Sequence, residues 1–445
     1  MALEEPAPHA TNAAQPQHHA EAKPGAEEQF LNRIWTPITR QPIWCAATWL
    51  LLALLVTWSY GANNLALPGI PIPLVDLMLI ALIVGSRSWW RPLTMDGPGR
   101  TILVLLVLLS AYGGVRLLVD IPEHGLAAVR GSVFIVEAWA VFLGVGVARR
   151  LGRVNVERGV SIVFGTALVW FCLYPFRTQV IDLSPMVAGV QRSAPLFAFA
   201  SLGFVSGLAL LWFGTKRTNA SAVASAVSVA VILMAQSRGV FAGITVASLV
   251  LLGMSRRRAS HLLFKRLVTG GIAVIALLAL LPPLPGRLGA VSFGTVIELV
   301  DTGIGREGEV SSSFDDRANW NKATIAAIEE KELGWVFGVG FGADLTDGFE
   351  VNGIRVATPH NDFLEFYARL GIGFFPWVGL WLVSSRTMFS RAGRGDQIAL
   401  WGFASTMVIV AVSLTQPFSS FAYGGMVWWL LVGLVLGLAP TRTAN

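Results

Sequence analysis

Long apolar stretches recur along the chain at the length that a membrane-crossing helix requires. Such a helix needs about 20 mostly apolar residues, and stretches of this kind predict about twelve spans. The predicted ranges are 43–60, 68–85, 101–119, 131–148, 159–176, 195–213, 220–236, 239–254, 267–283, 369–385, 398–415 and 421–439. The seventh and eighth ranges are so close together that they are expected to form a tight hairpin. The pattern predicts an all-α polytopic membrane protein.

The composition points to the same class. The chain is 54% hydrophobic and 13% charged, whereas soluble domains have about 25% charged residues. The net charge of +6 does not indicate nucleic-acid binding, because most of the basic residues cluster between predicted spans, where they set topology and meet anionic lipid. Cys45 and Cys172 both fall within predicted spans, so neither a disulfide framework nor a metal site is expected.

Basic residues fall on every second connection between the predicted spans, and this predicts the orientation. Lys and Arg are enriched in cytoplasmic loops. The basic connections are 87–100, 149–158, 216–217, 256–266 and 386–394. These connections and both termini are therefore expected on the cytoplasmic side. The long polar segment between the ninth and tenth spans is then expected outside.

Four segments follow from this topology. Residues 1–40 are rich in Ala, Pro, Glu and Gln and are expected to be a disordered cytoplasmic tail. Residues 41–284 carry spans one to nine. Residues 285–362 form a large outer loop, partly helical, and residues 363–445 carry the last three spans with a short cytoplasmic tail. The outer loop is the segment in which chemistry is expected.

Two patterns in the outer loop predict local structure. Ser313 to Asp316 resembles a capping box that opens a helix ending near Glu332. The apolar face of this helix would include Trp320, Ile325 and Ile328. Phe337 to Gly342 is rich in glycine but lacks the strand-to-helix context of a dinucleotide-binding loop. A flexible turn that returns the chain to the membrane is the simpler interpretation.

His360 is the main candidate for chemistry, in the run Thr358-Pro359-His360-Asn361-Asp362. Thr358 is the expected N-cap and Pro359 the first helical residue, so His360 would lie in the first turn of a helix leading into the tenth span. The positive helix end would disfavour a charged imidazole and keep it able to accept a proton. A structural role is the open alternative. No His/Cys cluster or paired-aspartate motif accompanies this residue, so no metal is expected.

Arginines at the outer side of the predicted topology are candidate anion ligands. Arg238 follows Ser237 at the tip of the tight hairpin, where a guanidinium suits bidentate phosphate binding. Arg192 is a weaker candidate of the same kind. Arg317 lies at the start of the outer-loop helix and either binds an anion or pairs with Asp315 or another nearby acid.

Some charged residues lie within predicted spans, where ionisable side chains are costly and often functional. Arg116 and Arg130 either act on a substrate, extend to the outer lipid headgroups, or pair with carboxylates such as Asp120 and Glu137. A pathway through Glu137, Asp76 and Arg116 would suit a transporter or flippase for a lipid-linked solute, which is the main alternative function. A transporter, however, has no need of a folded outer loop that supplies an arginine and a histidine.

The run from Pro359 to Glu365, followed by 370–373, resembles the O-antigen ligase and polymerase superfamily of bacterial envelope glycosyltransferases. Arg317 to Trp320 and the turn at 338–340 match the region before that histidine in the family. Ser237-Arg238-Gly239 matches its arginine at an outer span end. The order and sidedness of these motifs make the resemblance fairly specific.

The resemblance covers residues 195–440 and implies both a GT-C-like fold and a function. Members transfer a glycan from undecaprenyl diphosphate to a sugar hydroxyl at the periplasmic face of the inner membrane. Ligases use lipid A–core as acceptor and polymerases use another lipid-linked repeat, and the sequence does not separate the two. By this resemblance His360 would be the base, and Arg238 and Arg317, with Arg192 as a third candidate, would hold the diphosphate. An inverting mechanism without metal or other cofactor is implied.

Overall fold

The structure is a computed structural model. It describes residues 42–65, 72–86, 97–176, 199–254, 264–272, 311–351, 354–419 and 421–438, with a few single positions and short strands between them. The predicted tail at 1–40 and Arg192 lie outside the described side chains. Everything below concerns the unit from Pro42 onward.

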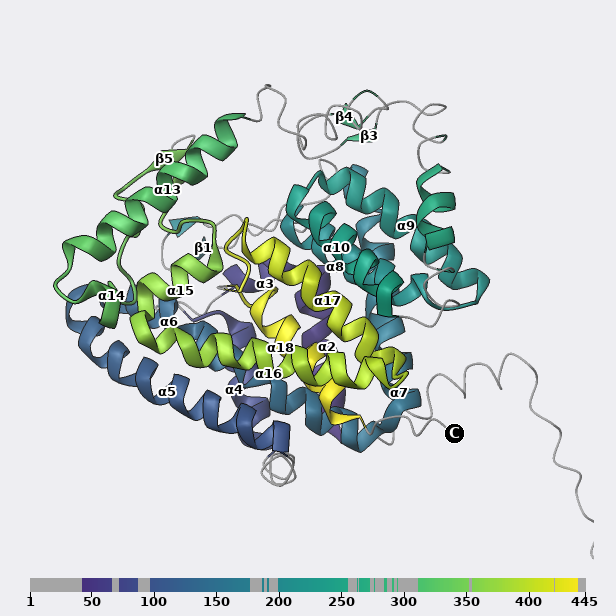
Figure 1. The fold of residues 1–445 in the computed structure, drawn as a ribbon, viewed down its shortest axis with the longest axis horizontal. Helices are drawn as coiled ribbons and strands as arrows, with labels where there is room; N and C mark the ends of the chain where they lie inside the picture. Colours follow the sequence, from purple (N-terminus) through teal and green to yellow (C-terminus); the bar gives the residue numbers. More distant parts are fainter. Residues whose placement is uncertain are drawn as a thin grey trace, which may run out of the picture. The chain divides into compact units, whose positions relative to one another are not determined.

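The described chain is almost entirely helical (Figure 1). The longer helices are α2 (Ile43–Thr57), α3 (Ser59–Asn64), α4 (Leu74–Gly85), α5 (Gly97–His124), α6 (Leu126–Ala138), α7 (Ala140–Phe171), α8 (Phe199–Gly214), α9 (Asn219–Ala235), α10 (Arg238–Met254), α13 (Ser311–Glu330), α14 (Gly334–Phe337), α15 (Asp362–Leu370), α16 (Phe374–Gly393), α17 (Gln397–Ser413) and α18 (Gly425–Gly437). Short 3-10 helices are η3 (Tyr174–Phe176) and η4 (Gly371–Gly373). The predicted all-α class is confirmed.

Strands in the described chain are limited to antiparallel pairs with two residues on each side. The pairs are β1 (Met186–Val187) with β2 (Val190–Gln191), β3 (Leu284–Pro285) with β4 (Ala290–Val291), and β5 (Glu350–Val351) with β6 (Ile354–Arg355). The last pair lies in the predicted outer loop, just before His360.

A described helix occupies each predicted span except the ninth, most of which lies outside the described residues. Three helical stretches are long and apolar enough to cross a membrane, namely Gly97–His124, Leu126–Phe176 and Asp362–Gly393, and the other apolar helices described are shorter. The membrane character of the chain is therefore supported. The number of spans stays a prediction.

Helix α7 is broken at Gly152, whose φ of 72° and ψ of 171° are not helical. Glycine accepts this conformation because it has no Cβ. The break falls in the basic connection at 149–158 and separates the fourth and fifth predicted spans. The fourth range, 131–148, is itself formed by α6 and the first part of α7.

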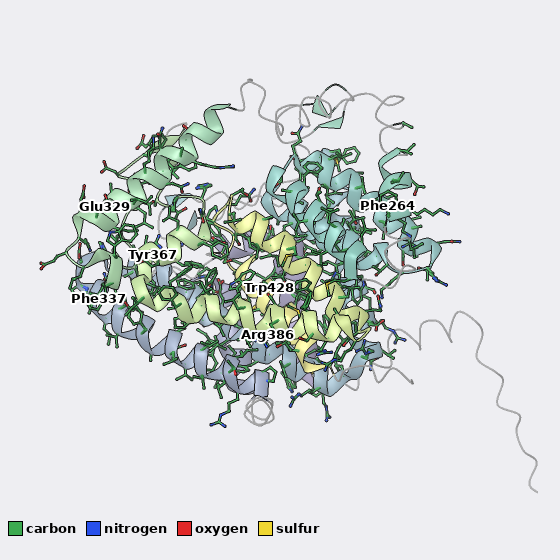
Figure 2. The ribbon with its side chains drawn as sticks, in the orientation of Figure 1. Phe264, Glu329, Phe337, Tyr367, Arg386 and Trp428 are labelled. Atoms are coloured by element: carbon green, nitrogen blue, oxygen red, sulfur yellow. The ribbon has the colours of Figure 1, made fainter. Side chains whose placement is uncertain are left out.

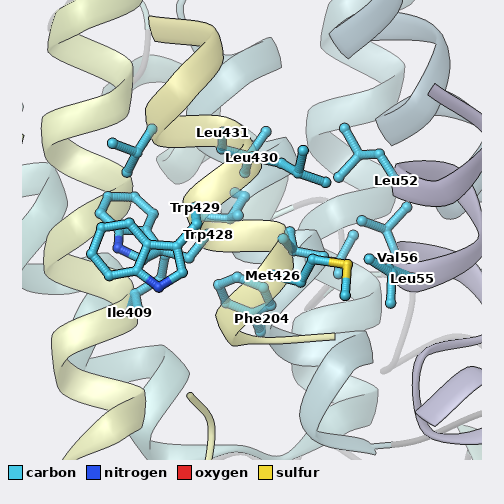
Figure 3. Packing of buried hydrophobic residues seen from close by; sticks show 14 of the residues in the cluster. Leu52, Leu55, Val56, Phe204, Ile409, Met426, Trp428, Trp429, Leu430 and Leu431 are labelled. Carbon is cyan, nitrogen blue, oxygen red and sulfur yellow. The ribbon is translucent and has the colours of Figure 1, made fainter. Parts of the chain in front are cut away.

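Helix α18 lies at the centre of the apolar core. It contacts α2, α6, α7, α16 and α17, and its residues are apolar and buried on every side, as expected for a helix inside a large or membrane-embedded bundle. Figure 3 shows Leu52 and Val56 of α2 on one side of α18 and Ile409 of α17 on the other. A Cβ on Gly144 or Gly433 would overlap backbone atoms of the facing helix, so these glycines permit the close approach of α7 and α18.

Candidate functional site

The segment that carries His360 is built around a small core of its own, formed by Ile328, Val339, Leu345 and Ala368. Helix α13 packs against α14 and α15. The Thr324 hydroxyl on α13 donates to the carbonyl of Leu345, at 2.9 Å. These contacts hold α13 against the chain that returns to α15.

A second contact ties α14 to α15. The Tyr367 hydroxyl on α15 donates to the Trp335 carbonyl on α14, at 2.7 Å, and Figure 2 shows Tyr367 and Phe337 in this part of the molecule. Helices α13, α14 and α15 therefore contact one another and together form the platform that carries His360.

Helix α13 differs from its prediction at both ends and on one face. It begins at Ser311, before the expected capping box, and ends at Glu330; the side chains of the expected box lie largely outside the described ones. Trp320 and Ile328 are buried as predicted, but Ile325 is 38% exposed. The buried row follows the four-residue spacing of 320, 324 and 328, so Ile325 is turned away from it. The prediction for Ile325 was wrong.

Helix α15 begins three residues later than predicted, and His360 is therefore not in its first turn. The N-cap is Asn361, whose side-chain oxygen accepts a hydrogen bond from the backbone N–H of Leu364, at 3.3 Å. Asparagine is among the best N-cap residues. His360 precedes this cap and has a φ of 55°. The argument from the positive helix end does not apply to its imidazole.

Other contacts determine how the His360 imidazole is held. Its ring lies 4.7 Å from the ring of Trp320, centroid to centroid, and its Nδ1 lies 3.2 Å from the carbonyl oxygen of Thr358. A carbonyl oxygen only accepts, so this contact favours the tautomer with the proton on Nδ1 and the lone pair on Nε2. The arrangement suits a histidine that takes up a proton through Nε2.

The backbone of His360 is also unusual. A non-glycine residue with positive φ is uncommon, and such a conformation costs on the order of 1–3 kcal/mol, which the surrounding structure must offset. Residues of this kind concentrate at active sites and ligand clamps. The cap at Asn361, the packing on Trp320 and the contact of Nδ1 with the Thr358 carbonyl help to hold His360 in this conformation.

Arg317 lies on the same side of α13 as Trp320. Residues three apart on a helix are neighbours on its surface, and the Trp320 ring contacts His360. The Arg317 side chain is half-buried. The structure thus brings Arg317 and His360, which are far apart in the sequence, to one region of the predicted outer loop.

Arg238 is the first residue of α10 and follows a tight turn, in which α9 ends at Ala235 and Gln236 takes a left-handed conformation with a φ of 48°. The turn agrees with the prediction, but the two helices do not pack on each other as a hairpin, because α9 packs mainly against α8 and α10 against α17. The Gln416 side-chain amide donates to the Ser237 hydroxyl, at 3.4 Å. Gln416 belongs to the loop between α17 and α18, residues 414–424. The backbone of Arg238 is therefore placed beside this loop, while its side chain lies outside the described ones.

The same loop also contacts the start of α15. The carboxylate of Asp362 is fully buried and accepts a hydrogen bond from the backbone N–H of Ser419, at 2.6 Å. Asp362 follows His360 by two residues. The α17–α18 loop thus contacts both the turn that precedes Arg238 and the segment that carries His360. Sequence reasoning missed this anchor, because no periodic pattern reveals a contact between residues 57 positions apart.

The glycine turn at 338–342 is held tightly rather than being flexible, so that prediction was wrong. The Val339 N–H donates to the Ala368 carbonyl, at 2.5 Å, and the Phe341 N–H donates to the Asp120 carboxylate, at 2.7 Å. Arg116 pairs with Asp120 at 3.0 Å and also donates to the Val339 carbonyl at 2.9 Å. Arg116 and Asp120 of α5 therefore hold the backbone of the turn through hydrogen bonds with Val339 and Phe341.

These contacts decide between the alternatives for Arg116, which pairs with a carboxylate. They also concern the transporter pathway, in which Arg116 would act together with Asp76 and Glu137. Asp76 and Glu137 are both buried, and a Cβ on Gly425 would lie 2.5 Å from the Glu137 carboxylate, at the start of α18. Arg116 instead links the glycine turn to α5 through Val339 and Asp120. These contacts account for the charge of Arg116 in the described structure, so no solute pathway is needed to explain it.

Comparison with known families addresses the same segment. Residues 220–378 match the family described as O-antigen ligase. This part of the chain is similar to the O-antigen ligase family. No curated protein matches the chain at a significant level. The resemblance drawn from the residues around His360 is confirmed, and it supports a membrane glycosyltransferase of the ligase and polymerase type, which acts on a lipid-linked glycan and a saccharide.

The matched segment runs from the start of α9 into α16, so it contains the turn before Arg238, helices α13 to α15 beside His360, and the glycine turn. Its contacts with α5 lie outside the matched residues. Arg116 and Asp120 therefore contact the candidate site from outside the residues that match the family.

Gly340 offers a test of how rigidly the turn must be held. Its φ is 111°, and a Cβ there would lie 2.5 Å from both Arg116 and Asp120. Gly340→Ala should lower the free energy of unfolding by about 1–3 kcal/mol, from backbone strain alone, and lower the thermal unfolding midpoint of the purified protein. Gly114→Ala on α5, where a Cβ meets nothing within 4 Å, is the control and should not be destabilising. Equal midpoints for both variants would contradict the tight packing of the turn.

Proposed function

We propose that the chain transfers a glycan from undecaprenyl diphosphate to a saccharide hydroxyl at the periplasmic face of a bacterial inner membrane. The observation that carries this proposal is His360 itself. Its ring is held by Trp320 and its Nδ1 faces the Thr358 carbonyl, within a segment of the O-antigen ligase family. Arg317 lies on the same face of α13 as Trp320.

In the proposed reaction, His360 Nε2 takes the proton of the acceptor hydroxyl as its oxygen attacks the anomeric carbon of the donor. The new glycosidic bond forms as the bond from the anomeric carbon to the diphosphate oxygen breaks. Attack opposite to the leaving group inverts the configuration. A general base of this kind contributes roughly 10²–10⁴-fold to the rate.

The leaving diphosphate gains negative charge as the bond breaks, and fixed positive charge at that position lowers the barrier. Arg238 and Arg317, with Arg192 as a third candidate, would supply it. Guanidinium groups match phosphate oxygens in a bidentate fashion and can stand in for a metal ion in this role. The proposed mechanism therefore requires no cofactor.

The energy for the reaction would come from the donor. The outer face of the inner membrane has no pool of nucleotide sugars, so a preactivated lipid-linked glycan is the natural substrate. The direct test is transfer by the purified protein without an ion gradient, since a transporter leaves the glycosidic linkage of its solute intact. The proposed acceptor is either lipid A–core or a second lipid-linked repeat.

The proposal also predicts which segments lie on each side of the membrane. Both termini and the basic connection at 256–266 would be cytoplasmic, and residues 285–362 would be periplasmic, because Lys and Arg favour cytoplasmic loops. A membrane-impermeant thiol reagent added to the periplasm should label Glu329→Cys on α13 and not Lys265→Cys; both positions are exposed. The background would carry Cys172→Ser. The reverse labelling pattern would contradict the orientation.

A further inference from the structure

A cavity of about 840 Å³ lies at the far end of the helix bundle from the candidate site. It is bounded by the first turns of α5, the region of the Gly152 break in α7, and the last turns of α16 and α18. Helix α5 contacts the glycine turn through Asp120 and reaches the cavity at Pro98. At 1.5 Å per residue these two positions are roughly 33 Å apart along the helix.

That separation matches the hydrocarbon thickness of a bilayer, about 30 Å. The cavity is therefore placed at the opposite membrane face from the candidate site. With the proposed orientation this is the cytoplasmic face. The glycosyl transfer proposed above does not involve the cavity.

The polar side of the cavity is strongly basic. The guanidinium-bearing residues that line it are Arg149, Arg153, Arg391 and Arg394, and no Asp or Glu is among the described lining residues. They come from α7 and from the last turn and C-cap of α16. Positive charge gathered in one concave site attracts an anion.

One carboxylate beside the cavity orients two of these arginines. Asp396 contacts Arg391 at 2.6 Å and Arg153 at 3.1 Å. Burial alone would raise the pKa of Asp396, but the hydrogen bond and charge of Arg391, with those of Arg153, outweigh burial and hold the pKa below its usual range. Asp396 is therefore ionised at neutral pH. Among the described side chains, the cavity therefore brings four arginines together with Asp396 beside two of them.

The rest of the cavity wall is apolar. It is formed by side chains from α5, α7 and α18 and the residue after it, including Ile102, Val141, Phe142, Leu436 and Leu438. A soluble anion such as inorganic phosphate would leave this wall without a partner. An amphiphile, by contrast, would place its charged head at the arginines and its hydrocarbon along the wall.

We propose that this cavity binds an anionic membrane lipid, with its phosphate on the arginines and part of an acyl chain against the apolar wall. Arginine recognises phosphate oxygens through paired hydrogen bonds. Basic pockets between transmembrane helices on the cytoplasmic side bind lipid headgroups in this way. The lipid would bridge α7 and α16, which carry the arginines.

The test uses full-length protein in detergent and measures bound lipid by native mass spectrometry, with phosphatidylglycerol and phosphatidylcholine as the probes. Phosphatidylglycerol should bind and phosphatidylcholine should bind more weakly. The variant Arg149→Gln with Arg394→Gln should weaken phosphatidylglycerol binding about 25-fold, since each basic residue near anionic lipid contributes about fivefold. Arg153 and Arg391 are left unchanged because they hold Asp396.

The matched control removes two arginines from the same helical ends but outside the cavity. Arg100 on α5 and Arg386 on α16 are exposed, and neither lines the cavity; Figure 2 labels Arg386. Arg100→Gln with Arg386→Gln should bind phosphatidylglycerol as the wild type does. An equal loss in both double variants would show a general effect of surface charge and overturn the proposal.

Two further measurements separate the remaining outcomes. Thr387→Phe places apolar volume inside the cavity without changing charge, and it should reduce phosphatidylglycerol binding; unchanged binding would place the lipid elsewhere. Inorganic phosphate should not displace phosphatidylglycerol at millimolar concentration. Displacement by phosphate alone would assign the cavity to a soluble anion instead. If the double variant unfolds in detergent, Arg394→Gln alone should still weaken binding about fivefold.

Discussion

His360→Asn is expected to remove most of the transfer activity, by roughly 10²–10⁴-fold, while leaving the fold intact. Asparagine accepts the positive φ of this position more readily than most residues do, so the backbone before α15 is preserved. The amide cannot take a proton from a hydroxyl at neutral pH. The loss therefore reports on proton transfer rather than on folding, and the rate of transfer by purified protein measures it.

Two companion variants separate chemistry from backbone strain. His360→Ala places a residue that disfavours positive φ at 55°, so its defect combines lost chemistry with destabilisation. His360→Gly relieves the backbone but removes the ring, and it should be as inactive as the Asn variant. The wild-type rate should also fall as the pH is lowered through the range in which imidazole becomes protonated. A folded Asn variant that keeps a tenth or more of the activity would make His360 a positioning residue.

Arg317→Ala should cost roughly 3 kcal/mol of transition-state stabilisation, which is more than a hundredfold in rate, by analogy with the loss of one oxyanion donor. Arg317→Lys should restore only part of the activity, because an ammonium group lacks the bidentate fork. Lys322→Ala removes an exposed cation from the same helix and is the matched control, expected to be fully active.

Arg238→Ala should show a loss of the same order, with Arg217→Ala beyond the other end of α9 as its control. If both arginines hold one diphosphate, the double variant should lose less than the sum of the two single effects, since groups that share a partner are not additive. Near-wild-type transfer by both folded single variants would contradict the diphosphate clamp.

Hydrophobic periodicity and charge were sufficient to predict most of the helices. The tight turn before Arg238 and the break in α7 at Gly152 both fall where apolar runs end and basic residues begin. These features are local, because the apolar residues that define a helix and the charges that define a connection are neighbours in the sequence. For the same reason the all-α class could be predicted from the sequence.

The details of the candidate site depend on contacts that no local pattern encodes. The prediction that Thr358 would cap the helix failed because Asn361, three residues later, makes the cap and leaves His360 with positive φ. The glycine turn was expected to be flexible, but Asp120 on α5 binds its backbone from more than two hundred positions away. The anchor from Asp362 to Ser419 is of the same kind. Long-range hydrogen bonds of buried polar groups fix these positions, and they are invisible in one sequence.

The most direct measurement of the central claim is the release of undecaprenyl diphosphate by the purified protein in detergent, without any ion gradient. The donor would be a glycan on undecaprenyl diphosphate, and the acceptor either lipid A–core or a second lipid-linked glycan. The proposed function predicts that lipid diphosphate and glycosylated acceptor appear in equal amounts, only when an acceptor is present, and that His360→Asn abolishes both. Wild-type protein that is folded and binds the donor, yet releases no lipid diphosphate with either acceptor, would contradict it.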